Sequence, residues 1–305
     1  MTLPLIFIVG PTAIGKSSFA INLAKKINGE IINADSMQVY KDLNILTARP
    51  SKEDIKTIPH HLYGYIKGEK RYNVANWCKD ISLIIKNNNT NNVHSIIVGG
   101  TGMYIDKLIN GLIDIPSIPE DVKKESEKYI LENGINKFIK EVKKIDPESF
   151  KNISINDINR LRRIWEVYNY TNIKFSNWLK NKNNNYLPKQ DYKLLLFTPD
   201  RNEIYSRVNR RFEEMMEKGA INEVKKLISL NLDNSLPIMR AHGVPEISSY
   251  LLKSITFDEC ILKGQQVTRN YVKRQLTWWR STSLRIYGSF DKFPSNIDLN
   301  SLKLT

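Results

Sequence analysis

A short segment near the start of the chain constrains its fold more than any other feature. Residues 10–17 have the sequence Gly-Pro-Thr-Ala-Ile-Gly-Lys-Ser, which fits the pattern G-x-x-x-x-G-K-[ST]. A continuous apolar run, residues 5–9, precedes the segment, and residues 16–27 have helical spacing. A glycine-rich turn between a buried strand and a helix directs backbone N–H groups and the positive end of the helix dipole toward an anion. The segment therefore predicts a phosphate-binding loop inside an α/β fold.

The residues of this loop have separate expected tasks. Lys16 supplies a positive charge for the terminal phosphate, and the hydroxyl of Ser17 can coordinate Mg²⁺, which we expect as the cofactor. The sequence has neither a base-reading Asn-Lys-x-Asp segment nor an acidic residue at the tip of the strand expected at 95–98, so the loop suits a leaving group better than a hydrolytic water. The predicted diphosphate- or nucleotide-binding residues of the loop are Gly10, Pro11, Thr12, Ala13, Ile14, Gly15, Lys16 and Ser17, with Ser17 as the predicted metal ligand.

The wider hydrophobic pattern predicts a P-loop NTPase-like α/β fold, with a parallel sheet and helices on both faces. After residue 35, mixed loops are expected as far as 94. The other expected strands are 30–34, 95–98 and 193–197, and the other expected helices of the core are 201–217, 220–230 and 264–280.

The middle of the chain differs from this core. Residues 116–192 contain no convincing strand, whereas 120–132, 134–145 and 157–170 have helical spacing. We therefore expect an inserted all-helical domain at 116–192, a discontinuous core made of 1–115 and 193–290, and a C-terminal tail at 291–305. The Asn-rich tract 181–185 is expected to be a mobile surface loop.

Composition favours a polyanionic partner. The 46 Lys and Arg residues outnumber the 32 Asp and Glu residues, so the formal net charge is +14, as is common for partners of nucleic acids or phosphates. An excess of Asn and Lys on solvated faces would give the same total, so clustering of charge carries more weight. Two cysteines are too few for a disulfide-rich scaffold or a four-cysteine zinc site. No apolar stretch approaches the length of a membrane span, and we expect a cytoplasmic protein.

Six blocks, in chain order, make the sequence resemble the tRNA dimethylallyltransferases, enzymes that prenylate an adenosine beside the anticodon. The first is the phosphate-binding loop; the others are Asn-Ala-Asp-Ser-Met-Gln-Val-Tyr at 33–40, 47–50 with 59–62, Val-Gly-Gly-Thr-Gly-Met-Tyr at 98–104, 156–168 and 268–280. The chain departs at 240–245, where it has Arg-Ala-His-Gly-Val-Pro and the family often has Ile-Gly-Tyr. No Cys/His finger follows the core, so the chain resembles the bacterial type.

The resemblance implies a reaction. A dimethylallyl group would pass from dimethylallyl diphosphate to the exocyclic N6 amine of the adenosine 3′ to the tRNA anticodon, and diphosphate would be released. The amine must be held in line with the allylic carbon and must lose a proton, while the departing diphosphate needs positive charge around it.

Asp35 is the candidate general base, by its position and by the resemblance. It follows a predicted strand beside the phosphate-binding strand, and open α/β sheets place their sites at the carboxyl ends of strands. A helix cap or an outer Mg²⁺ ligand are the alternatives. Thr101 follows Gly99 and Gly100 at another strand tip. The resemblance implies that its hydroxyl bonds the oxygen between the allylic carbon and phosphorus, and a helix N-cap is the alternative.

Arg160 is implied to bind the donor diphosphate. Ile164 and Val167 share its helical face, so its side chain is expected to point at least partly inward. An ion pair with a core carboxylate is the alternative. The predicted catalytic residues are Lys16, Asp35, Thr101 and Arg160.

Arg207 and Arg211 lie one helical turn apart and complete the predicted diphosphate-binding set. They either close over the donor diphosphate or form an exposed face paired with Glu213, Glu214 and Glu217, and the two interpretations carry equal weight.

The segment 269–285 has five basic residues, no acidic residue and interleaved aromatic residues, which is typical of binding to loop RNA. The alternatives are that Trp278 or Trp279 packs in the core, and that Met37 fills a core instead of bordering the acceptor. Arg162 and Arg163 lie on helix faces that suit tRNA phosphates. The predicted tRNA-binding residues are Asp35, Ser36, Met37, Gln38, Thr101, Lys123, Asn159, Arg160, Leu161, Arg162, Arg163, Arg240, Lys273, Arg274 and Arg280.

The expected partners are the tRNA anticodon arm and dimethylallyl diphosphate, bound by a monomer without membrane contact. Three other functions stay open. An adenylate isopentenyltransferase would use a free nucleotide and would need neither the helical insertion nor the basic helix. A small-molecule kinase would phosphorylate its substrate from ATP, and a nucleic-acid-binding ATPase would show turnover stimulated by RNA.

Overall fold

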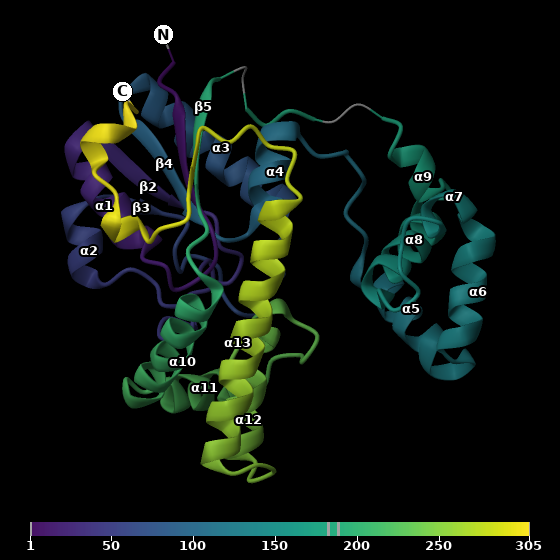
Figure 1. Cartoon of the computed structure of the whole chain (residues 1–305). Coiled ribbons are helices and arrows are strands. Elements are labelled where there is room, and N and C mark those ends of the chain that lie inside the picture. The colour runs from purple at the N-terminus through teal and green to yellow at the C-terminus, as the bar shows by residue number, and fades with distance from the viewer. Residues whose placement is uncertain (1, 182–183, 188–189, 305) are drawn as a thin grey trace. The chain divides into compact units, whose positions relative to one another are not determined.

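The computed structural model describes residues 2–181, 184–187 and 190–304 (Figure 1). Contacts divide the chain into two compact units: unit 1, Met1–Ile109 with Tyr186–Thr305, and unit 2, Asn110–Asn185. The domain limits suggested by the sequence lie a few residues further along the chain. Two residues of the expected loop 181–185, Lys182 and Asn183, lie outside the described residues. Among the helices that the structure describes, none combines the length and the apolar character needed to cross a membrane.

Unit 1 is built on a six-stranded parallel sheet, which confirms the predicted fold class. Its spatial order is β3-β2-β4-β1-β5-β6. The four predicted strands are present, whereas β3 and β6 have only two and three residues and show no readable period in the sequence. The strands are β1 Leu5–Val9, β2 Gly29–Asn33, β3 His60–His61, β4 His94–Gly99, β5 Tyr192–Phe197 and β6 Gly288–Phe290.

Helices cover both faces of this sheet (Figure 1). Strand β1 lies between β4 and β5, and its side chains point alternately into two hydrophobic cores, one on each face of the sheet. Ile6 and Ile8 pack with α1, and Phe7 packs in the opposite core, to which α3 and α4 contribute. The helices of unit 1 are α1 Lys16–Ile27, α2 Lys52–Thr57, α3 Val74–Thr90, α4 Gly102–Asn110, α10 Arg201–Glu217, α11 Ala220–Ser229, α12 Val244–Leu251 and α13 Phe257–Arg280.

Two helical expectations need correction. Residues 36–94 do not form only mixed loops, because α3 spans 74–90 and buries Trp77 and Ile81. The C-terminal end of this helix is rich in Asn. Helix α13 begins at Phe257 rather than at 264. A capping box between Thr256 and Glu259 starts it, and the helix runs through Gly264, where the ring of Phe212 on α10 takes the place of a side chain.

Residues 291–304 pack back onto α1 rather than extending from the core. Phe293, Leu302 and Leu304 are buried in the same hydrophobic cluster as Leu23 of α1. This C-terminal segment therefore belongs to the packing of unit 1.

The regular secondary structure among the described residues of unit 2 is helical, apart from one bridge between Leu112 and Asn184. Its core contains Phe138, Leu161 and Trp165. Its helices are α5 Glu120–Asn133, α6 Ile135–Ile145, α7 Pro147–Phe150, α8 Ile158–Thr171 and α9 Phe175–Trp178.

The parallel sheet brings four chain segments to one edge. Because all strands run in the same direction, the residues that follow β1, β2, β4 and β5 meet at the carboxyl edge. These segments are the phosphate-binding loop 10–17, the turn beginning at Asp35, the loop 100–101 and the start of α10. The candidate site lies there.

Candidate active site

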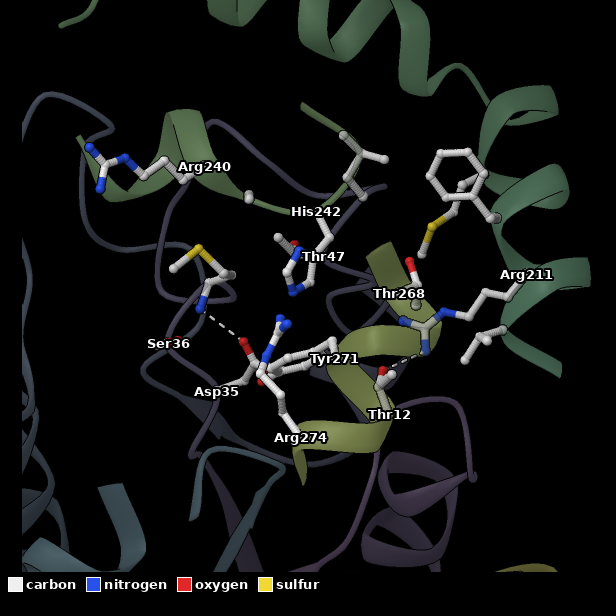
Figure 2. A pocket seen from close by; sticks show the side chains of 16 residues that line it. Thr12, Asp35, Ser36, Thr47, Arg211, Arg240, His242, Thr268, Tyr271 and Arg274 are labelled. Carbon is white, nitrogen blue, oxygen red and sulfur yellow. Dashed lines mark hydrogen bonds between the residues drawn. The ribbon is translucent and has the colours of Figure 1, made fainter. Parts of the chain in front are cut away.

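Two adjoining cavities lie at the carboxyl edge of the sheet. The cradle cavity has a volume of about 220 Å³ and is lined by the phosphate-binding loop together with Gln38, Tyr63 and Gly100. The side cavity has a volume of about 300 Å³ and is lined by Met37, Phe212, His242, Tyr271 and others (Figure 2). Both cavities are lined by Thr12, Asp35 and Arg211, so these three residues mark the junction between them.

The phosphate-binding loop has the backbone that its glycines allow. Gly10 and Gly15 have φ angles of 141° and 91°, in a region that side chains disfavour. A Cβ atom on Gly10 would lie 2.2 Å from the carbonyl oxygen of Phe197 on β5. The loop can therefore turn tightly between β1 and α1 only with glycine at this position.

Lys16 folds back over its own loop. Its Nζ donates hydrogen bonds to the carbonyls of Gly10 at 3.1 Å and Pro11 at 2.6 Å. Burial lowers the pKa of Lys16 to about 7; the Asp35 carboxylate opposes this shift, and the Arg211 guanidinium adds to it. With a pKa of about 7, this lysine is only partly charged at neutral pH.

The Asp35 carboxylate closes a turn directly after β2. Its Oδ1 accepts hydrogen bonds from the backbone N–H groups of Met37 at 2.8 Å and Gln38 at 3.3 Å (Figure 2). Asn33 fixes the same residue from the strand side, because its Oδ1 accepts from the Asp35 N–H at 2.8 Å. No helix begins at this turn, so the helix-cap alternative is wrong, and the carboxylate lines both cavities.

Thr101 lies against the Asp35 turn. Its Oγ1 accepts a hydrogen bond from the Ser36 N–H at 3.3 Å, and it also hydrogen-bonds the hydroxyl of Tyr271. This bond ties the Thr101 hydroxyl to the neighbouring turn, whereas its backbone carbonyl accepts from the Tyr104 N–H at the start of α4 at 3.0 Å. Asp35 and Thr101, from two different strand tips, are thus brought together as the sequence predicts.

The glycines around Thr101 serve contacts within the protein. A Cβ on Gly99 would lie 2.2 Å from the carbonyl oxygen of Ala34, and one on Gly100 would lie 2.0 Å from the side-chain nitrogen of Gln275. A Cβ on Gly102 would lie 2.1 Å from the indole of Trp278. The Gly-Gly-Thr-Gly sequence therefore allows β2 and α13 to approach this loop closely.

Of the two arginines predicted on α10, the structure brings one to the cradle. Arg211 lines both cavities and donates to the Oγ1 of Thr12 at 3.3 Å (Figure 2). Arg207 is exposed, with its guanidinium 3.5 Å from the ring centroid of Phe293. The predicted clamp of two arginines is therefore not formed. The alternative holds for Arg207 as far as its exposure, but Glu213 accepts from Gln265 and Glu214 pairs with Arg210 rather than with Arg207.

The side cavity combines apolar walls with a few polar groups. The rings of His242 and Tyr271 lie 4.8 Å apart, and Arg240 and Arg274 also line the cavity (Figure 2). Burial lowers the pKa of His242 and Arg274 adds to this shift, while Asp35 opposes it, so its imidazole is neutral at neutral pH. Met37 lines the same cavity and also packs against a core cluster, which unites the two interpretations made from the sequence.

Other predicted residues of unit 1 have structural tasks. The Gln38 amide donates to the carbonyls of Thr47 at 2.8 Å and Ala48 at 3.1 Å. Trp279 is buried, and Trp278 packs against the same cluster, so the core alternative is confirmed for both. Lys273 and Arg280 are exposed on α13.

The predicted inward orientation of Arg160 is wrong. Its side chain is 72% exposed and pairs with Asp157, with 3.2 Å between Nε and Oδ2. Arg160 lies in the first turn of α8, before the part of the helix that the core of unit 2 covers. The carboxylate it pairs with is a surface residue and not a core one.

Three further predicted tRNA contacts in unit 2 have protein partners. Arg162 is 19% exposed and bonds Ser126, Glu127 and Glu166. Lys123 pairs with Glu120 at 3.1 Å. Leu161 is completely buried, so a direct contact between Leu161 and RNA is excluded in this conformation. Burial lowers the pKa of Arg163, and Glu166 opposes the shift.

The cradle fits a magnesium ion. Ser17 and Asp35 both line the cavity with oxygen atoms, and Mg²⁺ is usually held by one or two protein oxygens, substrate phosphates and water. Within the described residues, no group of three or more His, Cys, Asp or Glu side chains forms a metal site of its own. His60 and His61 are instead bonded to the Ile58 carbonyl and to Glu30.

Gln275 lines the cradle cavity and was not among the site residues predicted from the sequence. It lies on α13 at a helical spacing that otherwise carries buried apolar residues, such as Val272 and Trp279. A polar amide in that register is the one sequence signal of a buried hydrogen-bonding task.

Comparison with known proteins agrees with this geometry. A family model described as IPP transferase matches residues 38–282, and one described as isopentenyl transferase matches residues 3–63. A tRNA dimethylallyltransferase of Hyphomonas neptunium is 39% identical over 90% of this chain and 87% of its own length. That of Pelagibacter ubique is 40% identical over 91% and 88%.

Solved structures are similar along nearly the whole chain. A tRNA isopentenylpyrophosphate transferase from Bacillus halodurans has a TM-score of 0.69 and 30% identity, with 98% of this chain and 92% of that one covered. A eukaryotic dimethylallyltransferase acting on tRNA has a TM-score of 0.81 and 27% identity, with 98% and 77% covered. The extent of these matches shows that the chain belongs to the tRNA dimethylallyltransferase family of IPP transferases.

Proposed function

We propose that this transferase moves a dimethylallyl group from dimethylallyl diphosphate to the N6 amine of the adenosine 3′ to the anticodon of tRNA. The observation that carries the proposal is the pair of adjoining cavities. One is built for phosphate, the other is largely apolar, and Asp35 lies where they meet.

The cradle cavity holds the donor diphosphate in this proposal. Lys16, Arg211 and the N-terminus of α1 supply positive charge, and Mg²⁺ on Ser17 would neutralise further negative charge as the leaving group departs. Of the arginines predicted for this task, only Arg211 has support from the geometry. Arg160 belongs to unit 2, and its task at the diphosphate stays a prediction from the sequence.

The side cavity receives the adenine in this proposal. Its volume of about 300 Å³ is at the small end of ligand cavities, which suits one flipped base. Met37 and Phe212 supply apolar walls, and Tyr271 supplies a ring on which a base can stack. The adenine must leave the anticodon loop to reach this recessed site.

Asp35 and Thr101 act where the two substrates meet. A bond forms between N6 and the allylic carbon, the bond from that carbon to the diphosphate oxygen breaks, and Asp35 takes the proton that N6 loses. Thr101 lies next to the Asp35 turn, because its Oγ1 accepts from the Ser36 N–H, and in this proposal its hydroxyl donates a hydrogen bond to the departing oxygen. Proton transfer by a positioned carboxylate contributes typically about 10²- to 10⁴-fold.

Exposed basic residues offer a path for the tRNA backbone. Lys273 and Arg280 lie on α13 beside Arg274, which lines the side cavity. A free nucleotide would have no use for this charge or for the inserted unit 2. We accordingly favour tRNA over adenylate as the acceptor, and we place the enzyme in the cytoplasm as a monomer.

Asp35→Asn tests the proposal. The wild-type protein with Mg²⁺, dimethylallyl diphosphate and unmodified tRNA should form isopentenyladenosine, detected by mass analysis of the nucleosides. The amide keeps the oxygen that Met37 and Gln38 bond, so we expect kcat to fall by about 10²- to 10⁴-fold with the fold intact.

Parallel reactions separate the alternatives. Asp258→Asn, an exposed carboxylate on α13, should behave as wild type. Product with AMP but none with tRNA would favour the adenylate enzyme. Labelled phosphate passing from ATP to a metabolite would favour a kinase. Unaltered kcat in Asp35→Asn would refute the assigned base.

A further inference from the structure

A buried amide joins the two loops of the candidate site. The side-chain oxygen of Gln275 accepts a hydrogen bond from the Thr12 N–H at 2.9 Å, and its nitrogen donates to the Gly100 carbonyl at 3.1 Å. The residue is only 5% exposed. One side chain on α13 therefore connects the phosphate-binding loop, which precedes α1, to the loop that carries Thr101.

The loop beyond β4 is shaped around this amide. The missing Cβ of Gly100 leaves the space that the Gln275 nitrogen occupies, since a methyl group there would lie 2.0 Å away. A buried primary amide is costly unless both of its ends are bonded, and here each end has a partner on a different loop. Two independent features of the structure thus serve the same contact.

The chemistry of this contact requires an amide. One end must accept from an N–H group and the other must donate to a carbonyl, which a carboxylate or an apolar side chain of similar size cannot do. Thr12, whose N–H bonds Gln275, lines both cavities and accepts a hydrogen bond from Arg211. Gln275 therefore holds a residue at the junction of the two cavities. On the same helix, Arg274 directly precedes Gln275 and Tyr271 lies one turn earlier, and both line the side cavity.

We propose that Gln275 is a positioning residue that fixes the separation between the donor diphosphate and Thr101, and thereby aligns the allylic carbon with the N6 amine. The inference rests on the proposed function. Gln275 does not touch the reacting atoms and acts through the backbone of Thr12 and Gly100. A displacement of about 1 Å at reacting atoms can cost on the order of 10²-fold in rate, so the effect should fall on kcat.

Gln275→Met and Gln275→Glu separate positioning from charge. Met keeps the length and loses both hydrogen bonds, so we expect kcat to fall by about 10- to 100-fold, while KM for the donor and Kd for inorganic diphosphate change by less than about threefold. Glu still accepts from Thr12 but sets a negative oxygen against the Gly100 carbonyl and beside the cradle. It should therefore also raise the Kd for diphosphate by tenfold or more.

Several controls make the measurement specific. Leu276→Met changes the next buried residue of α13, whose apolar side chain makes no hydrogen bond to either loop, and should keep both kcat and KM. Diphosphate calorimetry counts the folded sites, so that kcat is expressed per active site. Gln275→Asn, which keeps the amide on a shorter chain, should lose kcat in the same way if the Met variant does not fold.

The outcomes are distinct. A wild-type kcat per folded site in Gln275→Met, even with a lowered melting temperature, would mean a purely structural amide and would overturn the inference. A loss confined to Kd for diphosphate in that variant would overturn it too, because Gln275 would then act in binding. If the wild-type protein itself makes no prenylated tRNA, the proposed function fails together with the inference.

Discussion

At the scale of the single residue, the protonation state of Lys16 should change when the donor diphosphate binds. In the absence of an anion its pKa is lowered to about 7 by burial. A diphosphate in the cradle would add negative charge beside the ammonium group and raise the pKa again. The lysine is therefore partly neutral before the donor arrives and charged afterwards, so donor binding takes up a proton wherever the free protein has already lost it.

Calorimetry of dimethylallyl diphosphate binding in buffers of different ionisation enthalpy measures this uptake. Phosphate esters such as this donor complete their ionisation near about pH 6, so the ligand contributes little at higher pH. We expect uptake approaching one proton per site at about pH 8.5 and much less at about pH 6, where Lys16 is already protonated.

Lys16→Arg provides the control, because a guanidinium stays charged throughout this range. Uptake that is equal in this variant and in the wild type would show that another group, and not Lys16, binds the proton.

At the scale of the element, two arginines of α8 in unit 2 differ in exposure and in ion pairing. Arg160 is exposed in the first turn, whereas Arg162 connects Glu127, Ser126 and the nearly buried Glu166. Removal of Arg162 leaves the Glu166 carboxylate without its charged partner in a desolvated place, which is more costly than the loss of a surface pair.

Arg162→Gln should lower the free energy of unfolding of unit 2 by about 3 kcal/mol, whereas Arg160→Gln should change it by less than about 1 kcal/mol. Hydrogen exchange of the α8 amides in the full chain measures both. Equal protection in the two variants would contradict a structural task for Arg162.

The elements also show how far the sequence was sufficient. The long apolar strands and the phosphate-binding loop are local patterns, and they are confirmed because local patterns determine them. Helix α3 was not predicted because its C-terminal end is rich in Asn, which disfavours helix. The start of α13 was missed because Gly264 interrupts the helical pattern, and only the ring of Phe212 on α10 explains why glycine stands there. Contacts of that kind, between residues far apart in the chain, cannot be predicted from a local sequence pattern.

The site divides in the same way. The Asp35 turn and Thr101 could be predicted because each follows a strand of a parallel sheet. Arg207 and Arg211 are both basic and lie one turn apart. Packing with other parts of the chain places only Arg211 at the cradle, while Arg207 stays exposed with its guanidinium over the ring of Phe293. The contacts of Gln275 could not be predicted, because its two hydrogen-bond partners are more than 170 residues away in the sequence.

At the scale of the whole molecule, a net charge of +14 makes tRNA binding dependent on salt. Each phosphate that a Lys or Arg neutralises releases counterions, and the slope of log K against log salt changes by slightly less than one per contact. Exposed basic residues beside the side cavity should contribute to this slope, and those on remote faces should not.

Filter binding of unmodified tRNA over a series of salt concentrations tests this division. Lys273→Ala should reduce the magnitude of the slope by about one, with a uniform loss of affinity. Lys25→Ala, an exposed lysine in the last turn of α1, should leave the slope as it is. Identical slopes in the wild type and in Lys273→Ala would remove α13 from the phosphate-contact surface.

The position of β1 between β4 and β5 has a consequence for biosynthesis. Strand β5 follows unit 2 along the chain, so β1 gains its second neighbour only after residues 110–185 have been made. Domains generally fold as units while they emerge from the ribosome. The insertion can therefore be finished while the sheet still has a bare edge at β1, and a chaperone that binds the nascent chain would find its apolar target there.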